Sequence, residues 1–173
     1  MDFLAWAKAN NIEIDQTDLE KVEVLKISKL QIKALPSCLI ELKNLKELEI
    51  SDCDQLVNID FSIMNREQLF SISVYNCNTV ESINLDNTDN AEHLQFFNVR
   101  SCANLNRLPK NLGLLENLMF VSICDCPNLL EIPSSLGASG KLRSLSVSGC
   151  KSITELPSAL LESKFLNLNL ALN

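Results

Sequence analysis

The same short pattern of residues occurs six times in this chain of 173 residues and is followed by a shorter seventh copy. The copies begin at residues 22, 45, 69, 94, 118, 142 and 165, so successive copies start 23 to 25 residues apart. Counted from its first residue, every copy has an apolar residue at positions 1, 4 and 6, and five copies have cysteine at position 9. A unit of this length cannot bury its apolar side alone, so the copies must stack into one elongated core.

The fourth copy shows the structure expected of each unit. Phe97 and Val99 alternate with polar residues, which predicts a short strand with these two side chains pointing inward. Leu108-Pro109 follows, and the apolar residues after it have the spacing of a short helical or 3₁₀ segment that returns the chain to the next copy. Stacking such units places all the strands in one parallel sheet.

The pattern LxxLxLxxC, followed in several copies by LxxLP, resembles the leucine-rich repeat family in its cysteine-containing form of about 24 residues. The resemblance covers residues 22–173. These repeats are similar to those of plant disease-resistance receptors and of bacterial leucine-rich repeat proteins. It implies an α/β repeat solenoid, shaped as a horseshoe or arc, with a parallel concave sheet. Two copies depart from the family: Ile59-Asp60 replaces Leu-Pro, and the insertion at residues 83–93 predicts an irregular outer return.

Residues 1–21 precede the repeats and are predicted to form an N-terminal capping helix and a connection to residues 22–173, the repeats themselves. Phe3, Leu4, Trp6 and Ala7 have helical spacing, and Asn10-Asn11 ends the segment. The segment is similar to the helix that opens many bacterial members of the family. A stack of repeats needs a cover for its first apolar side, and this amphipathic helix is expected to supply it.

Charge and composition exclude several classes of partner and location. The net charge of −7 disfavours binding to nucleic acid or to an anionic membrane surface, because both reward clustered lysine and arginine. No apolar run is long enough to span a bilayer, and Asp2 occupies the start of the chain, where a signal peptide carries positive charge. We therefore expect no membrane insertion and no signal peptide. We expect a cytoplasmic location, or the cytosol of a host cell if the protein is an effector.

The cysteines are the most regular polar feature of the repeats. We predict that the five at position 9 point inward as a structural thiol ladder and bond to backbone groups: Cys53, Cys77, Cys102, Cys126 and Cys150. The spacing of roughly 4.8 Å between strands does not forbid disulfides, but parallel side chains and a reducing compartment argue against them. No histidine accompanies these cysteines and no CxxC pair occurs, so we expect neither a metal site nor a cofactor.

Catalysis is not predicted. Cys38 belongs to an outer return, whereas Cys124 is at position 7 and should face outward from the sheet. The only histidine, His93, lies at the opposite end of the unit from Cys124, which argues against a thiol–imidazole pair. Glu47 and Glu49, together with Asp52, lack a flanking pocket for acid–base chemistry, and the four glycines form no phosphate-binding loop. A thiol-dependent enzyme is the least favoured alternative.

The outward-facing positions 3, 5 and 7 carry the residues that differ between copies. Aromatic and arginine side chains, which dominate protein interfaces, gather there in the middle copies, with two glutamates beside them. The predicted partner-binding residues are Phe96, Phe120, Tyr75, Arg100, Glu47, Glu49 and Phe70. We expect a non-catalytic protein–protein interaction module. The resemblance to bacterial members suggests an effector acting in a host cell, and the alternative is an endogenous cytosolic scaffold or receptor fragment.

The seventh copy predicts a contact of its own. Leu168 and Leu170 match positions 4 and 6, with Leu166 beside them, and no polar cap follows. A parallel strand there leaves open backbone and an apolar flank, which either another chain or the last leucines of this chain must cover. Our hypothesis is edge-to-edge self-association, a homodimer, through residues 165–172.

Overall fold

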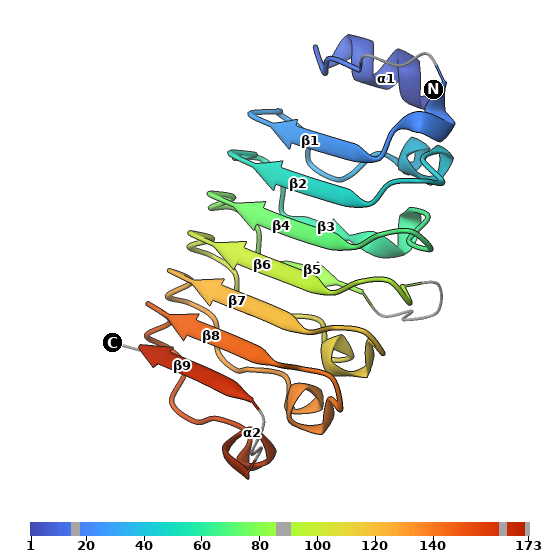
Figure 1. The fold of residues 1–173 in the computed structure, drawn as a ribbon. Coiled ribbons are helices and arrows are strands. Elements are labelled where there is room, and N and C mark those ends of the chain that lie inside the picture. The colour runs from blue at the N-terminus through green and yellow to red at the C-terminus, as the bar shows by residue number, and fades with distance from the viewer. Residues whose placement is uncertain (15–17, 86–90, 163–165, 172–173) are drawn as a thin grey trace.

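The computed structural model describes residues 1–14, 18–85, 91–162 and 166–171. Seven parallel strands form one sheet in the order β1-β2-β4-β6-β7-β8-β9 (Figure 1). Each strand occupies positions 3 to 7 of its copy and pairs with the same positions of the next copy. The strands are β1 (Val24–Ser28), β2 (Glu47–Ser51), β4 (Ser71–Tyr75), β6 (Phe96–Arg100), β7 (Phe120–Cys124), β8 (Ser144–Ser148) and β9 (Asn167–Ala171).

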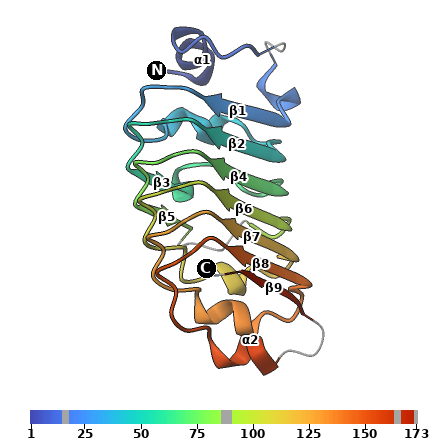
Figure 2. The same cartoon turned by 90° about the vertical axis from the view of Figure 1, so that its left-hand side faces the viewer.

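Short helical segments return the chain from one strand to the next, as predicted. They are η2 (Ser37–Glu41), η3 (Phe61–Ile63), η4 (Leu112–Leu114), η5 (Ser134–Ala138) and α2 (Ser158–Glu162), whereas η1 (Leu19–Lys21) precedes the first strand. The sequence did not predict a second parallel sheet, which β3 (Asn58–Asp60) and β5 (Ser82–Asn84) form away from the main sheet (Figure 2). It occurs in the two copies that lack Leu-Pro, where no proline removes a backbone donor. The predicted irregular return falls partly outside the described residues.

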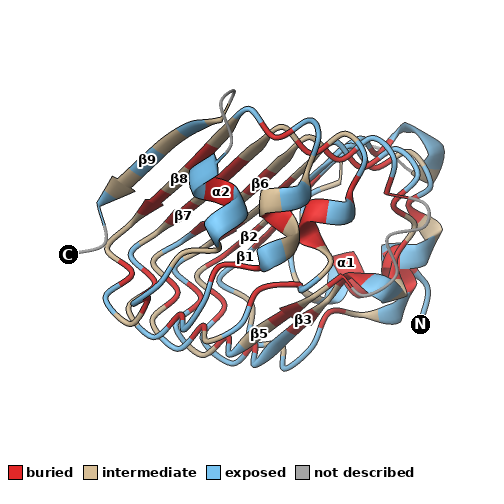
Figure 3. Cartoon of the chain, turned by 90° about the horizontal axis from the view of Figure 1, so that it is seen from below, coloured by how far each residue is buried: buried red, intermediate tan, exposed pale blue. Residues whose placement is uncertain are grey.

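The core fills the space between the strands and the returns, and buried residues line the inside of every turn of the chain (Figure 3). The strands alternate between buried and more exposed residues, as the side-chain period of two requires. In β6, for example, the exposed fractions of Phe97 and Val99 are 0% and 1%, whereas Phe96 and Asn98 are half-buried. The predicted inward positions 4 and 6 are therefore confirmed.

A tight turn at position 8 follows each of the first six strands of the main sheet. The residue there has a left-handed backbone in six successive copies, with φ between 53° and 63°: Lys29, Asp52, Asn76, Ser101, Asp125 and Gly149. Its N–H donates to the position 7 carbonyl of the following copy at 2.8 to 3.1 Å. This turn bends the chain inward, so the residue at position 9 enters the core. The strain of a left-handed residue is offset by a hydrogen bond in each copy.

Helix α1 (Phe3–Ala9) lies beyond β1 at the N-terminal end of the stack (Figure 1). Asp2 caps it by accepting a hydrogen bond from the Ala5 N–H at 2.8 Å. Phe3 and Trp6 are buried, and the Phe3 N–H donates to Glu41 Oε2 in η2 at 3.2 Å. The helix lies within the predicted segment of residues 1–21, and its role as a cap stays a prediction. Among the described residues, no helix is both long and apolar enough to cross a membrane.

Candidate partner-binding surface

Three phenylalanines from consecutive copies contact one another on the outer face of the main sheet, and we call them the aromatic row: Phe70, Phe96 and Phe120. The Phe96 and Phe120 rings are stacked, with centroids 4.8 Å apart and planes within 9° of parallel. Phe70 lies on the other side of Phe96 at 5.0 Å with a tilted ring. Phe70 is 36% exposed, and the other two are half-buried. The adjacency of Phe96 and Phe120 follows from the register, in which they are partners, and Phe70 directly precedes Ser71, the partner of Phe96 on the other side.

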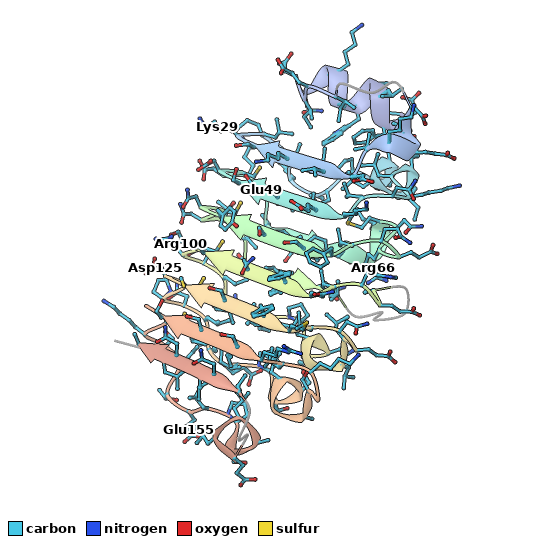
Figure 4. All side chains as sticks on the ribbon, viewed as in Figure 1. Lys29, Glu49, Arg66, Arg100, Asp125 and Glu155 are labelled. Carbon is cyan, nitrogen blue, oxygen red and sulfur yellow. The ribbon has the colours of Figure 1, made fainter. Side chains whose placement is uncertain are left out.

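Tyr75 and Arg100 form a second group at the opposite ends of the strands. They are register partners on β4 and β6, and Arg100 Nε lies 3.8 Å from Asp125 Oδ2 (Figure 4). Position 7 is four residues beyond position 3, which separates this group from the aromatic row by about 13 Å. From their shared face, Tyr75 and Arg100 were expected to lie close to the two phenylalanines. The structure instead places two groups on one face, because side chains on the same face are spread along the strand.

The predicted acidic flank is smaller than the sequence suggested. Glu49 Oε2 lies 3.5 Å from Lys26 Nζ in the neighbouring strand, so its charge is compensated. Asp52 accepts a hydrogen bond from the Asn76 side chain at 3.2 Å. Glu47 is exposed and makes no ion pair with any described residue. Glu47 is thus the carboxylate that remains available to a partner beside the aromatic row.

Small polar residues form the floor between the two groups. The centre of this floor comprises Ser73, Asn98 and Ser122 at position 5 of successive strands. Asn98 Nδ2 donates to Ser73 Oγ at 3.3 Å, and all three residues are half-buried. Because these side chains are short, a partner can approach the backbone closely while its own side chains contact the aromatic row.

The position 9 cysteines all point inward, with exposed fractions of 0%: Cys53, Cys77, Cys102, Cys126 and Cys150. Each thiol donates to the carbonyl of position 7 in its own copy at 3.3 to 3.5 Å. They thus bond to backbone at the turn that follows each strand. All seven cysteines of the chain are free thiols in this structure.

The electrostatics of the ladder depend on burial and on contacts between neighbouring thiols. Burial raises the pKa of Cys102. The neighbouring Cys53 thiol raises the pKa of Cys77, with burial acting in the same direction, and the neighbouring Cys77 thiol lowers the pKa of Cys53 to about 7. The same contact between Cys126 and Cys150 raises the pKa of the first and lowers that of the second to about 7. Both pairs lie inside the core, out of contact with solvent.

The two cysteines outside the ladder differ in access. Cys124 lies half-exposed on the outer face of the sheet, 3.6 Å from Ser122 Oγ. Cys38 is buried in η2, and burial raises its pKa. Within the described ranges, no group of three or more histidine, cysteine, aspartate and glutamate side chains is arranged to hold a metal ion.

Comparison with known proteins agrees with the architecture. No protein-family model matches the chain, and no curated protein matches it in sequence. Among solved structures, the leucine-rich repeat domain of the type III effector XopL superposes with a TM-score of 0.61 over 87% of this chain, at 17% identity. A leucine-rich repeat protein of Leptospira interrogans, LIC12759, superposes with a TM-score of 0.55 over 99% of this chain, at 20% identity.

This chain has a leucine-rich repeat fold. The predicted repeat solenoid with one parallel sheet is therefore confirmed. The chain spans 60% of the XopL domain structure and 46% of the Leptospira chain, so both matched structures are longer. At these identities the likeness concerns the fold, and the site residues must be argued from this chain alone.

The end of the leucine-rich repeat stack is formed by β9, which is paired with β8 on one side. Leu168 and Leu170 are half-buried and pack against the core, with Leu166 half-buried beside them. Phe165 and Leu172, the first and last residues of the predicted contact, lie outside the described residues. Self-association through this edge stays a prediction.

Two features of this leucine-rich repeat chain were not found from sequence. Arg66 is 4% exposed, although charged residues between repeats are ordinarily solvated, and no pattern in the sequence marks it as buried. On the return side, Leu130 is 61% exposed beside a groove that also involves Pro133 and Leu156. The 3.6-residue period that reveals an exposed leucine on a long helix is absent from such short returns.

Proposed function

We propose that this chain is a non-catalytic protein-binding module whose outer sheet face receives a protein partner at the aromatic row. The observation that supports this proposal is the contact of three phenylalanine rings on the face of the main sheet that points away from the core. Clustered aromatic side chains on an exposed surface are typical of interfaces, where they supply large contact area at low entropic cost.

The other predicted residues take supporting roles in this proposal. Tyr75 and Arg100 form a second contact at the far ends of the strands, and the Arg100 side chain is 67% exposed despite its long ion pair. Glu47 adds an uncompensated charge beside Phe70. Glu49 contributes little, because Lys26 already neutralises it.

The test is affinity purification with immobilised protein from bacterial and eukaryotic lysates. Partners captured by the natural chain should be lost with the double variant Phe96→Ser/Phe120→Ser. Leu130→Ser, which removes a side chain of greater exposure on the return side, is the matched control and should change nothing. Circular dichroism establishes that all variants fold. Identical sets of captured proteins for the natural chain and the phenylalanine variant would contradict the proposed site.

The setting of this activity is a separate proposal. We propose an effector that acts inside a host cell, supported by the fold likeness to a domain of a type III effector. The alternative is a cytosolic scaffold or a fragment of a larger receptor. A secretion assay with a reporter fused to the chain separates them, since export by the secretion machinery is required of an effector and is not expected of a scaffold.

A further inference from the structure

The surroundings of the aromatic row show which kind of partner segment it suits. Consecutive copies carry Glu47, Phe70, Phe96, Phe120 and Arg143 at position 2 or 3, so the five residues follow one another across the strands. The backbone places them in order: the Phe70 N–H bonds to the Lys46 carbonyl, Phe96 to the Phe70 carbonyl, and Phe120 pairs with Ser144, next to Arg143. An acid, three phenylalanines and a base therefore follow one another along the axis of the stack.

The two end charges are available to a partner. Glu47 and Arg143 are exposed, and neither forms an ion pair with a described residue. Near Glu47, Lys46 is paired with Glu23 at 2.7 Å and Lys26 with Glu49 at 3.5 Å, so those four charges largely cancel. Near Arg143, Lys141 bonds to the neutral Asn117 and adds a second positive charge. One end of the row is thus acidic and the other basic.

We infer that the aromatic row binds an amphipathic α-helix of a partner protein, laid along the axis of the stack, with its positive end at Glu47 and its negative end at Arg143. This inference rests on the proposed function and specifies the shape and polarity of the partner. The α-helix carries opposite partial charges at its two ends, which complement this surface even without charged side chains. Helices with an apolar stripe commonly bind to apolar surfaces in this way.

The dimensions agree with a helix. Five strands at about 4.8 Å spacing place Glu47 and Arg143 about 19 Å apart, the length of a helix of about 13 residues. A helix turn rises about 5.4 Å, close to the spacing between strands, so successive apolar side chains of the helix meet successive phenylalanines. The floor of serine and asparagine beside the row leaves room for a helix about 10 Å wide between it and Tyr75 and Arg100, about 13 Å away.

The geometry of the rings disfavours a sugar as the occupant. Sugar rings bind over open aromatic faces, whereas Phe96 and Phe120 cover one face of each other and Phe70 packs beside Phe96. Apolar side chains of a helix contact ring edges and faces alike, so they lose nothing from this stacking.

The experiment selects binders from displayed 13-residue peptides with a central apolar stripe, held as helices by staples. Three libraries differ in their end residues: lysine at one end and glutamate at the other, lysine at both ends, or glutamate at both ends. A fourth library has the mixed ends and a central proline that prevents helix formation. An array of oligosaccharides is probed in parallel.

We expect the mixed-end helices to be enriched at least ten-fold over the other libraries. Glu47→Lys should shift the preference to helices with glutamate at both ends, and Arg143→Glu to those with lysine at both ends, because each variant gives the surface two like charges. Phe96→Ser should abolish all enrichment. These single surface substitutions keep the fold, which circular dichroism verifies.

Several outcomes would overturn the inference. If the proline library is enriched as strongly as the mixed-end helices, the partner segment need not be a helix. If an oligosaccharide binds and its binding requires Phe96, the occupant is a sugar. In both cases the aromatic row remains the binding site. End-charge preferences that do not change with Glu47→Lys or Arg143→Glu refute the polarity. Enrichment of nothing refutes the helix, while the lysate experiment still decides the proposed function. Helices that bind equally to Phe96→Ser contradict both proposals.

Discussion

At the scale of single residues, two adjacent positions turn the chain from the sheet into the core. Position 8 takes a left-handed backbone, and only the last of the six residues there is glycine. The cysteine at position 9 then points into the core, where its small thiol donates a weak hydrogen bond to a carbonyl at the turn. Cysteine recurs at position 9 because this position accepts a small, weakly polar side chain that points into the core. The requirement is one of packing and not of a catalytic or metal-binding role.

The access of each thiol gives a direct test of this interpretation. In the folded protein, a maleimide reagent should modify Cys124 rapidly and the other six cysteines only as fast as the fold opens, because those six are buried. Mass spectrometry over time should show one fast adduct, and Cys124→Ser should remove it. Rapid modification of Cys53 or Cys150 would show that the lowered pKa of these thiols outweighs their burial.

At the scale of elements, each strand divides its residues between a core and a surface for binding. Phe96 and Phe97 are adjacent phenylalanines that differ in burial: the Phe97 side chain is fully buried and the Phe96 side chain faces outward. Phe97→Ala should destabilise the protein by about 3–5 kcal/mol through a cavity. Phe96→Ala should cost about 2 kcal/mol, the scale of its two aromatic pairs. Urea unfolding of the two variants measures both, and equal losses would contradict the assignment of the faces.

The returns between strands must also pack closely, and a glycine makes this feasible. A Cβ on Gly113 in η4 would lie 2.1 Å from the backbone carbonyl of Ser135 in η5, whereas a Cβ on Gly140 would meet nothing within 4 Å. Gly113→Ala should therefore destabilise by about 1–3 kcal/mol through overpacking. Gly140→Ala is the matched control and should be neutral or slightly stabilising. Thermal unfolding compares them, and equal midpoints would show that η4 and η5 separate easily.

The sequence was sufficient to predict the strands, because positions 4 and 6 alternate in every copy and the period of 23 to 25 residues sets their register. It predicted the contact of Phe96 with Phe120 for the same reason. It did not predict β3 and β5, since three-residue strands leave almost no period to detect. Its prediction that Tyr75 and Arg100 lie close to the row overlooked the four residues between positions 3 and 7, which share a face but lie about 13 Å apart along the strand.

At the scale of the whole molecule, stacking brings residues from different copies next to one another. The aromatic row draws one phenylalanine from each of three copies, and its end charges come from two more. Such a surface changes by substitution at positions 2, 3, 5 and 7 without loss of the core. This separation explains why the outer face varies between copies while positions 1, 4 and 6 stay apolar.

The edge formed by β9 is the remaining prediction at this scale. Leu168 and Leu170 cover the core only in part, and their backbone groups face away from β8, since the Asn167 N–H is the one that bonds to the preceding strand. We expect this chain to dimerise at high concentration by antiparallel pairing of two β9 strands, which satisfies these groups and covers the leucines.

Substitution on β9 makes this prediction specific. Asn167→Lys/Asn169→Lys places like charges close together across a two-fold axis and should restore the monomer mass in light scattering, because such pairs repel. Ser122→Lys, on the same face but away from the edge, should leave the dimer intact. A monomer mass for the natural chain at the highest concentration would refute the contact. A dimer that survives both β9 lysines would locate it elsewhere, and the exposed phenylalanines of the aromatic row would then be the next surface to substitute.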